Sequence, residues 1–321
     1  MIIISEAMIA ALMNKAQAFV AVEKTFASMA RRGARNFPVI REAIGHADAL
    51  YGFKSGFDRE ALNLGVKAGG YWPGNVQKGL TNHQSTIFLF DADTGKIRAV
   101  IGGNLLTALR TAAAAAVSVA YLARKDAKVL GIIGAGHQAK FQLEAIVRQR
   151  KFEKIVAWNR TPEKLIGLAS ISENLGLSFQ SVSLPELGAQ SDVIVTITSS
   201  FVPILKSTDL KPGTHIACMG TDTKGKQEVE TALLASATVF TDEIAQAVSI
   251  GECQHAIASG ILKLDDIKEL GSVIIGDHIG RSSDDETTVY DGTGVALQDL
   301  AVANVVLETA IQQGATQDVP F

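Results

Sequence analysis

Residues 129–139 decide the fold of this chain. They read VLGIIGAGHQA, an apolar run that leads into Gly-x-Gly-x-x-Ala. Gly134 permits a tight turn, Gly136 lets the backbone approach a phosphate at the positive N-terminus of a helix, and Ala139 stands where the third glycine packs a helix on a strand. The strand before this turn and the helical pattern after it predict the phosphate-binding turn of a dinucleotide-binding domain.

Strands and helices alternate downstream of that turn. Helices are predicted at 138–149 and 162–175, and strands at 128–133, 154–158, 193–198, 214–219 and 238–241. This alternation is typical of a parallel, doubly wound sheet, so the fold class is α/β with a Rossmann domain.

The sequence before the turn has a different pattern of apolar residues. A strand at 2–4 and one helix over 5–31 precede short alternating runs from 37 to 100, which predict a mainly antiparallel sheet. An alanine-rich helix at 105–124 connects the two parts, and a helix at 296–311 is expected to return to the first. We predict a discontinuous α+β domain (1–122 with 296–321) and a Rossmann domain (123–295).

Length, composition and charge limit the function. The 321 residues suffice for about two domains, and 47% hydrophobic with 20% charged residues is typical of a globular protein. A net charge of −3 provides no positive field for nucleic acid or an anionic membrane, so small molecules are the expected partners. The Ala-rich stretch 111–123 is shorter than a membrane span, and no signal peptide is expected.

Cysteine usage predicts the compartment. Cys218 and Cys253 cannot form a disulfide framework, and no Cys/His cluster has zinc spacing. We expect a cytoplasmic protein without a metal site.

The end of the second Rossmann strand bears on the cofactor. An Asp or Glu there would bind the ribose 2′-hydroxyl of NAD, but residues 158–161 read WNRT. Without a carboxylate, and with Arg160 available to pair with a 2′-phosphate, these residues favour NADP. The alternative is that Arg160 is only a solvated loop residue.

Four separated blocks resemble the ornithine cyclodeaminase/mu-crystallin family over nearly the whole chain. They are TNHQ at 81–84, RTAA at 110–113, GTDTKGKQE at 220–228 and DGTGVALQD at 291–299. The resemblance implies a two-domain homodimer whose first domain supplies the dimer interface and much of the substrate pocket. Within the family, residues 41–56 and 69–75 are most similar to the reductases of the β-hydroxyaspartate pathway that convert iminosuccinate to L-aspartate with NADH. That cofactor conflicts with the local NADP argument, so the cofactor is left as NAD(P)H.

The resemblance also implies the catalytic and substrate-binding residues. Lys67 and Arg41 match substrate-carboxylate positions, and Arg110 a position at the cofactor phosphates and the substrate carboxylate. Asp222, after the strand at 214–219, matches the residue that handles the proton at the substrate amine, and Lys67 is a second candidate for this role. His83 could bind a distal carboxylate. The alternatives are solvated charges at Arg41 and Lys67, an interdomain salt bridge at Arg110, a loop cap at Asp222 and a structural role for His83.

The remaining candidates are expected to contact the cofactor through the turn, the strand ends or family positions. They are Asn82, His83, Arg110, Thr111, Gly134, Gly136, His137, Gln138, Asn159, Arg160, Thr161, Thr198, Met219, Gly220, Thr221, Lys226 and Gly292.

The leading hypothesis is therefore reduction of an imino dicarboxylate by NAD(P)H. One alternative is ornithine cyclodeamination to proline and ammonia with recycled NAD, which residues 159–161 disfavour because cyclodeaminases of this family generally carry an acidic residue there. The other is a mu-crystallin-like protein that binds NADPH and a small acid without turnover, which Asp222 disfavours.

Overall fold

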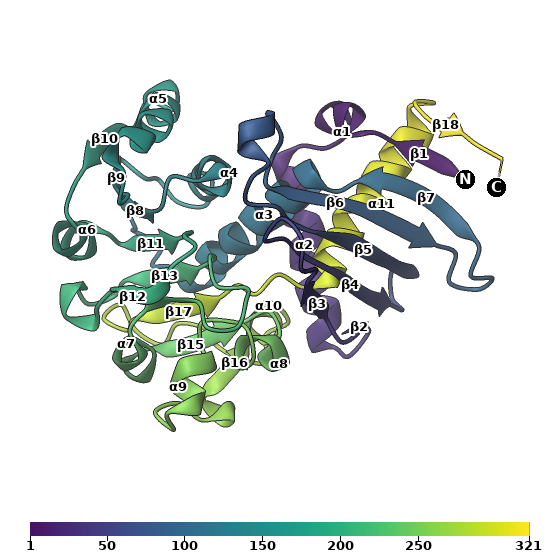
Figure 1. Ribbon diagram of the computed structural model, residues 1–321. Coiled ribbons are helices and arrows are strands. Elements are labelled where there is room, and N and C mark those ends of the chain that lie inside the picture. The colour runs from purple at the N-terminus through teal and green to yellow at the C-terminus, as the bar shows by residue number, and fades with distance from the viewer. Residues whose placement is uncertain (321) are drawn as a thin grey trace. The chain divides into compact units, whose positions relative to one another are not determined.

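A computed structural model describes residues 1–320, which form two compact units (Figure 1). Unit 1 comprises Met1–Arg110 together with the chain from Val295 onward, and unit 2 comprises Thr111–Gly294. The predicted boundaries after residue 122 and before residue 296 remain a prediction, since the first division falls within helix α3 (Asn104–Leu122).

Unit 1 is built on an eight-stranded sheet of order β18-β1-β7-β6-β5-β4-β2, with β3 also paired to β4. The pairs are antiparallel except β1 with β7. The strands are β1 (Ile2–Ile4), β2 (Ala34–Asn36), β3 (Ile40–Ala43), β4 (Leu50–Asp58), β5 (Asn63–Tyr71), β6 (His83–Phe90), β7 (Ile97–Gly102) and β18 (Gln317–Asp318).

One face of this sheet is covered by α11 (Ala296–Gln312), which lies on β4, β5 and β6 and packs against α2 (Lys15–Ala30). Glycine on the sheet permits the close approach: a Cβ added at Gly65 would lie 2.7 Å from Leu300 Cδ2. The C-terminal helix therefore returns to the first part of the chain, as expected.

The single helix expected over residues 5–31 is wrong. Two helices form, α1 (Glu6–Leu12) and α2, because Met13 is extended and Asn14 starts a new helix. The Asn14 side chain accepts hydrogen bonds from Ala16 N and Gln17 N, while the Gln17 side chain accepts from Asn14 N. This reciprocal cap outweighs the helical periodicity that continues through it.

Unit 2 contains a second eight-stranded sheet, of order β10-β9-β8-β11-β13-β17-β15-β16, in which every pair is parallel. The strands are β8 (Val129–Ile133), β9 (Lys154–Trp158), β10 (Ser178–Ser181), β11 (Val193–Thr196), β13 (His215–Cys218), β15 (Thr238–Thr241), β16 (Ile267–Glu269) and β17 (Thr288–Asp291). The order reverses between β8 and β11, the point at which doubly wound sheets bind ligands. The predicted fold class is confirmed.

The helices of unit 2 connect these strands. They are α4 (His137–Ile146), α5 (Ile166–Asn174), α6 (Leu184–Gln190), α7 (Thr231–Ser236), α8 (Ile244–Ala247), α9 (Gln254–Ala258) and α10 (Leu270–Ile274), with 3₁₀ turns η2 (Pro162–Leu165), η3 (Ser207–Asp209) and η4 (Leu264–Asp266). Unit 1 contains the further helix turn η1 (Val76–Lys78). A separate parallel pair, β12 (Phe201–Leu205) and β14 (Gln227–Val229), was not expected from the sequence.

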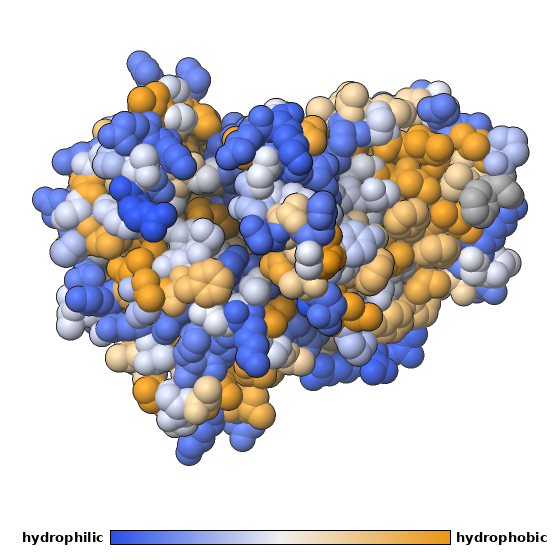
Figure 2. All heavy atoms as spheres, in the orientation of Figure 1, coloured by the Kyte–Doolittle hydropathy of each residue, from blue (hydrophilic) through white to orange (hydrophobic). Residues whose placement is uncertain are grey.

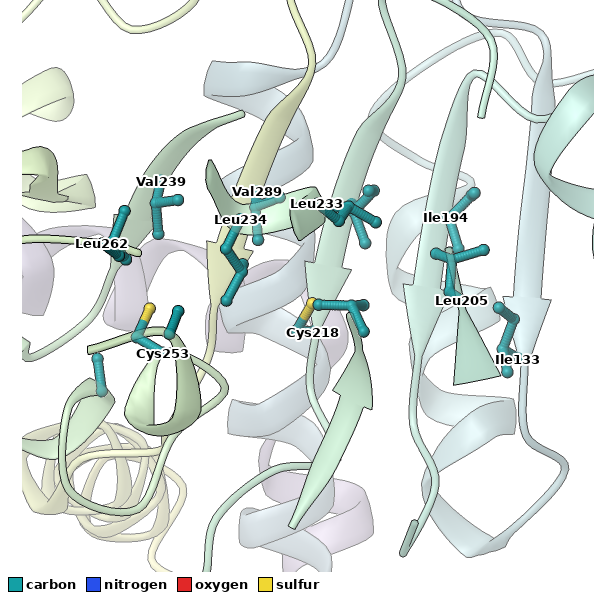
Figure 3. Close-up of a cluster of buried hydrophobic side chains, with 14 of the residues drawn as sticks. Ile133, Ile194, Leu205, Cys218, Leu233, Leu234, Val239, Cys253, Leu262 and Val289 are labelled. Carbon is teal, nitrogen blue, oxygen red and sulfur yellow. The ribbon is translucent and has the colours of Figure 1, made fainter. Parts of the chain in front are cut away.

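The core of unit 2 packs on the parallel strands (Figure 3). Ile194 of β11 and Val289 of β17 are fully buried with Leu233 and Leu234 of α7. Strands buried on both faces carry continuous apolar runs, and β8, β9, β11, β13 and β15 overlap strands predicted from the sequence. β10, β16 and β17 were not predicted.

Helix α3 is long and apolar enough to cross a membrane by length and composition, with a mean hydropathy of 1.6 over its most apolar stretch. In the structure 83% of that stretch is buried within the protein. Core helices of globular proteins have the same composition.

The side chain of Arg150 caps the C-terminal end of α3. Its guanidinium donates hydrogen bonds to the carbonyl oxygens of Val119 (2.8 Å), Ala120 (3.1 Å) and Ala123 (2.7 Å). The last carbonyls of a helix have no partner within the helix, so a charged donor there satisfies several at once.

We therefore expect Arg150→Ala to lower the free energy of unfolding by about 2–4 kcal/mol, because buried carbonyls lose a charged donor. Urea unfolding followed by circular dichroism measures the loss. Arg148→Ala, at an exposed position of the same segment, is the control and should change the value by less than about 0.5 kcal/mol. Equal losses in the two variants would contradict this role for Arg150.

Candidate active site

The predicted site residues fall into two groups, one in each unit. Unit 2 holds the glycine-rich turn, the ends of its parallel strands and Asp222. Unit 1 holds Arg41, Lys67, Asn82, His83 and Arg110.

The glycine-rich turn has the geometry that its sequence predicts. Gly134 has φ +114°, a conformation that favours glycine, and its N–H donates to the Trp158 carbonyl (2.9 Å). Gly136 is extended and precedes α4, and a Cβ added there would meet no atom within 4 Å. The space beside the Gly136 backbone, where α4 begins, is therefore free of other protein atoms.

Side chains beside this turn fit a bound dinucleotide. The Gln138 Oε1 atom is buried and has no hydrogen-bond partner among the described residues, as expected where a ligand supplies the missing donor. Burial and Lys140 lower the pKa of His137, whose ring lies 5.3 Å from that of Phe141. A neutral His137 would contribute its backbone N–H rather than a charge to a pyrophosphate.

The end of β9 carries the residues predicted to read the ribose. Asn159 closes this turn, because its Nδ2 donates to the Thr161 carbonyl (2.7 Å), and Arg160 is exposed. Their contact with a cofactor remains a prediction.

The loop after β13 holds Asp222 beside a cation. Asp222 Oδ1 lies 2.7 Å from Lys226 Nζ and accepts from the Thr223 hydroxyl (3.2 Å). Lys226 Nζ also donates to the Gly220 carbonyl (3.2 Å), so it holds the loop in shape. These bonds show a loop-organising role for Asp222 and leave its catalytic role a prediction.

The neighbouring strands bring the other predicted residues to the same edge of the sheet. β13 pairs with β11 on one side and β17 on the other. Thr198, which follows β11, and Gly292, which follows β17, therefore lie on either side of the loop that begins at Met219 after β13. Gly292 N donates to the Cys218 carbonyl (2.9 Å), and a Cβ at Gly292 would lie 2.5 Å from Met219 Sδ. Thr221 donates its hydroxyl to Glu252 (2.5 Å) and is fully buried.

In unit 1, a buried carboxylate links two of the predicted cations. Asp299 of α11 lies 2.6 Å from Lys67 Nζ on β5 and 2.9 Å from Arg110 Nε on α3. Arg110 also donates to Gln298 Oε1 (3.3 Å), and Lys67 to the Thr107 hydroxyl (3.4 Å). Lys67 and Arg110 are therefore buried ionic groups and not solvated surface charges.

Burial and neighbouring charges set the protonation of this cluster. The loss of hydration lowers the pKa of Lys67 to about 7, because burial and the charges of Arg110 and Lys54 outweigh the attraction of Asp299. Burial alone would raise the pKa of Asp299, but Arg110 and Lys67 lower it to about 2. Asp299 is thus ionised at neutral pH, where Lys67 can both hold and release a proton.

The other predicted residues of unit 1 differ in what they can do. Burial, with Lys67 and Arg110, lowers the pKa of His83 to about 3, so a neutral His83 can offer one hydrogen bond to a carboxylate but no charge. Asn82 accepts from Val76 N (3.2 Å) and donates to the Tyr71 hydroxyl (3.1 Å), which organises its own loop.

Arg41 lies on the same face of the sheet as Lys67. It is opposite Gly52 on β4, two residues from Lys54, and Lys54 is directly opposite Lys67. Side chains at such positions share a face. Thr111, which follows Arg110, is buried.

Sequence reasoning missed several charged residues that the structure places beside the predicted ones. Asp299 stands in the quoted block 291–299 and Glu228 in the block 220–228, but neither was assigned a role. Lys54 could have been found by aligning the two neighbouring strands, since it is the cross-strand neighbour of Lys67. Glu252 lies in an irregular segment with no sequence signal.

Similarity to known proteins defines the class of this chain. The family profile described as "Ornithine cyclodeaminase/mu-crystallin family" matches residues 2–314. The chain belongs to this family, whose fold has been solved several times.

Individual relatives cover almost the whole chain. An iminosuccinate reductase of Paracoccus denitrificans is 61% identical over 319 residues, 99% of either chain. Its crystal structure in complex with NAD+ matches with a TM-score of 0.96, covering 100% of this chain and 99% of that one. An archaeal alanine dehydrogenase dimer with bound NAD matches at 33% identity and a TM-score of 0.95, with coverage of 100% and 99%.

A third relative adds a bound product-like acid. The Thermococcus litoralis Δ1-pyrroline-2-carboxylate reductase, in complex with NADH and L-proline, is 27% identical with a TM-score of 0.94, covering 99% of this chain and 100% of that one. The relatives thus include reductases of cyclic and acyclic imino acids.

The ionic cluster of unit 1 leads to a stability prediction. We expect Asp299→Asn to lower the free energy of unfolding at pH 7 by about 3 kcal/mol, because Lys67 and Arg110 lose their buried counter-charge. Glu308→Gln, on the same helix as Asp299, breaks the surface pair with Arg98 of β7 and should cost less than about 1 kcal/mol. Chemical unfolding measures both, and similar small losses would show that the buried pair is not needed for stability.

Proposed function

We propose that the chain is an NADH-dependent imine reductase that converts iminosuccinate to L-aspartate. The observation that carries this proposal is the 61% identity, over 99% of both chains, to an iminosuccinate reductase. The cationic groups of unit 1 and the dinucleotide turn of unit 2 support it independently.

The proposed reaction needs positive charge for the carboxylates of the substrate. Arg110 offers a planar guanidinium that suits a carboxylate, and Lys67 offers an ammonium whose proton is weakly held. Arg41 and Lys54, on the same sheet face as Lys67, supply further positive charge for a second carboxylate. A dicarboxylic imine suits this set better than a monocarboxylic one.

Reduction also needs a proton at the imine nitrogen. NADH, when bound, supplies the hydride for the imine carbon. We propose that Lys67 supplies the proton to the nitrogen, since its pKa of about 7 allows both protonation states near neutral pH. Asp222, paired with Lys226, is proposed to orient the iminium group, as its place in the family motif implies.

The cofactor is proposed to be NADH, although Arg160 alone favours NADPH. The support is that three solved relatives carry NAD+, NAD or NADH. The open face at Gly136 and the unpartnered Gln138 Oε1 fit the pyrophosphate of either coenzyme. Arg160 would then remain a solvated residue of the turn.

We further propose that the protein is a cytoplasmic homodimer. The face of the unit 1 sheet opposite α11 exposes apolar side chains (Figure 2), among them Ile40 (54% exposed), Tyr51 (37%) and Phe53 (41%). A second copy would cover this surface, and the solved alanine dehydrogenase relative is described as a dimer. Cys218 and Cys253 are free and buried, as expected in a reducing compartment.

One assay tests the proposed reaction. Iminosuccinate is generated from oxaloacetate and ammonia, and the loss of NADH or NADPH is followed at 340 nm with identification of the amino acid formed. We expect L-aspartate, with kcat/KM for NADH at least about tenfold above that for NADPH, and slower reduction of the imine of pyruvate.

Other results of these assays would support one of the two alternative functions. Proline and ammonia from ornithine without a net change in NADH would indicate a cyclodeaminase. Binding of NADPH without any turnover would indicate a protein of the mu-crystallin kind. Either result would overturn the proposed reduction of iminosuccinate.

A further inference from the structure

The strand exits of β11 and β13, meaning the residues at which the chain leaves each strand, are both hydrogen-bonded to one buried carboxylate in unit 2. This carboxylate belongs to Glu228. Its Oε1 accepts the backbone N–H of Thr198 (2.6 Å). Its Oε2 accepts the hydroxyl of Thr196 (2.7 Å) and the backbone N–H of Gly220 (2.9 Å). Glu228 is fully buried, so water cannot replace any of these bonds.

The two exits bonded to Glu228 carry Thr198 and Gly220, which are both predicted to contact the cofactor. Thr198 follows β11, Gly220 follows β13, and the two strands are paired in register up to Thr196 and Cys218. Ligands of doubly wound sheets bind outside the carboxyl ends of the strands. The carboxylate therefore joins two loops that must keep a fixed spacing if they are to contact one ligand.

Packing around this carboxylate leaves little freedom. A Cβ added at Gly220 would lie 2.3 Å from the Thr198 carbonyl oxygen and 2.5 Å from Glu228 Oε1. The loops are thus in contact at the level of their backbones. A displaced carboxylate would move both of them.

A second buried carboxylate fixes the backbone of Glu228. Glu252 accepts from Glu228 N (2.9 Å), Val229 N (2.8 Å) and the Thr221 hydroxyl. Burial and the charge of Glu228 raise the pKa of Glu252 to about 8, and burial also raises the pKa of Glu228, against the hydrogen bonds from Thr196, Thr198 and Gly220. Glu228 remains the acceptor for its three donors.

We propose that Glu228 is a positioning residue of the reductase, whose carboxylate holds the exits of β11 and β13 in the spacing that hydride transfer requires. This inference rests on the proposed function. Glu228 need not touch the substrate or the reacting atoms, and it acts through Thr198 and Gly220.

The isosteric amide cannot replace this carboxylate. In Glu228→Gln one side-chain oxygen becomes an NH2 group, which can only donate. It must then face the N–H of Thr198 or the N–H of Gly220, and neither can accept. One strand exit therefore loses its bond although the volume of the side chain is unchanged.

Glu228→Gln tests the proposal, with Glu230→Gln as the matched control. Glu230 ends the same segment and also accepts a backbone N–H and a hydroxyl, both from Ser207 (2.5 Å each), but at η3 rather than at the strand exits. We expect Glu228→Gln to lower kcat/KM for NADH at least about tenfold and to raise the isotope effect on kcat with NADH deuterated at the transferred position. Glu230→Gln should keep both values within about twofold of wild type.

The outcomes separate positioning from stability. Loss of folded protein lowers kcat without changing KM or the isotope effect. That pattern would overturn the proposal. Wild-type values of all three quantities would also overturn it. If Glu228→Gln does not fold, Thr196→Val and Thr196→Ser decide: the valine variant should lose activity and the serine variant should keep it, and equal activity overturns the proposal. A wild-type protein that does not oxidise NADH would instead overturn the proposed function.

Discussion

The carboxylate of Asp299, fully buried between Lys67 and Arg110, is the interaction on which unit 1 depends. A buried carboxylate without counter-charges would be strongly unfavourable, so its position requires both cations. The three residues come from α11, β5 and α3, which are distant in the sequence. Their pairing connects the returning C-terminal helix to the sheet and holds Lys67 and Arg110 beside the same carboxylate.

The same pairing prepares the chemistry. A lysine in water has a pKa of about 10.4, which is too high for ready proton transfer at neutral pH. Burial shifts Lys67 towards neutrality, while Asp299 keeps the ammonium form accessible. A purely apolar site would leave Lys67 uncharged, and an exposed site would leave it permanently charged.

Unit 2 uses buried carboxylates for a different purpose. Asp192 accepts the N–H groups of Lys128 and Val129 where β8 begins, and Asp242 accepts those of Thr293 and Gly294 after β17. Together with Glu228, these side chains satisfy backbone donors that the ladder cannot reach. The parallel sheet provides the frame, and the acids determine how the chain enters and leaves it.

Much of this architecture follows from local sequence signals. The turn at Gly134 and the apolar strands of unit 2 could be predicted because periodicity and glycine placement are local. The break at Asn14 could not be separated from continuous helical periodicity, and β12 and β14 were not predicted, although β12 has five residues. Lys67 was found through family resemblance, whereas its partner Asp299 could not be assigned because their pairing joins residues far apart in the chain.

The titration of the Lys67 ammonium tests the account most directly. It can be followed by NMR in protein with isotopically labelled lysine side chains, with the signal assigned through Lys67→Arg. The account predicts a midpoint near pH 7, and a lower one in Asp299→Asn because the attraction that favours the charged form is removed. A midpoint near the ordinary value of about 10.4 would contradict the burial and the proton-donating role assigned to Lys67.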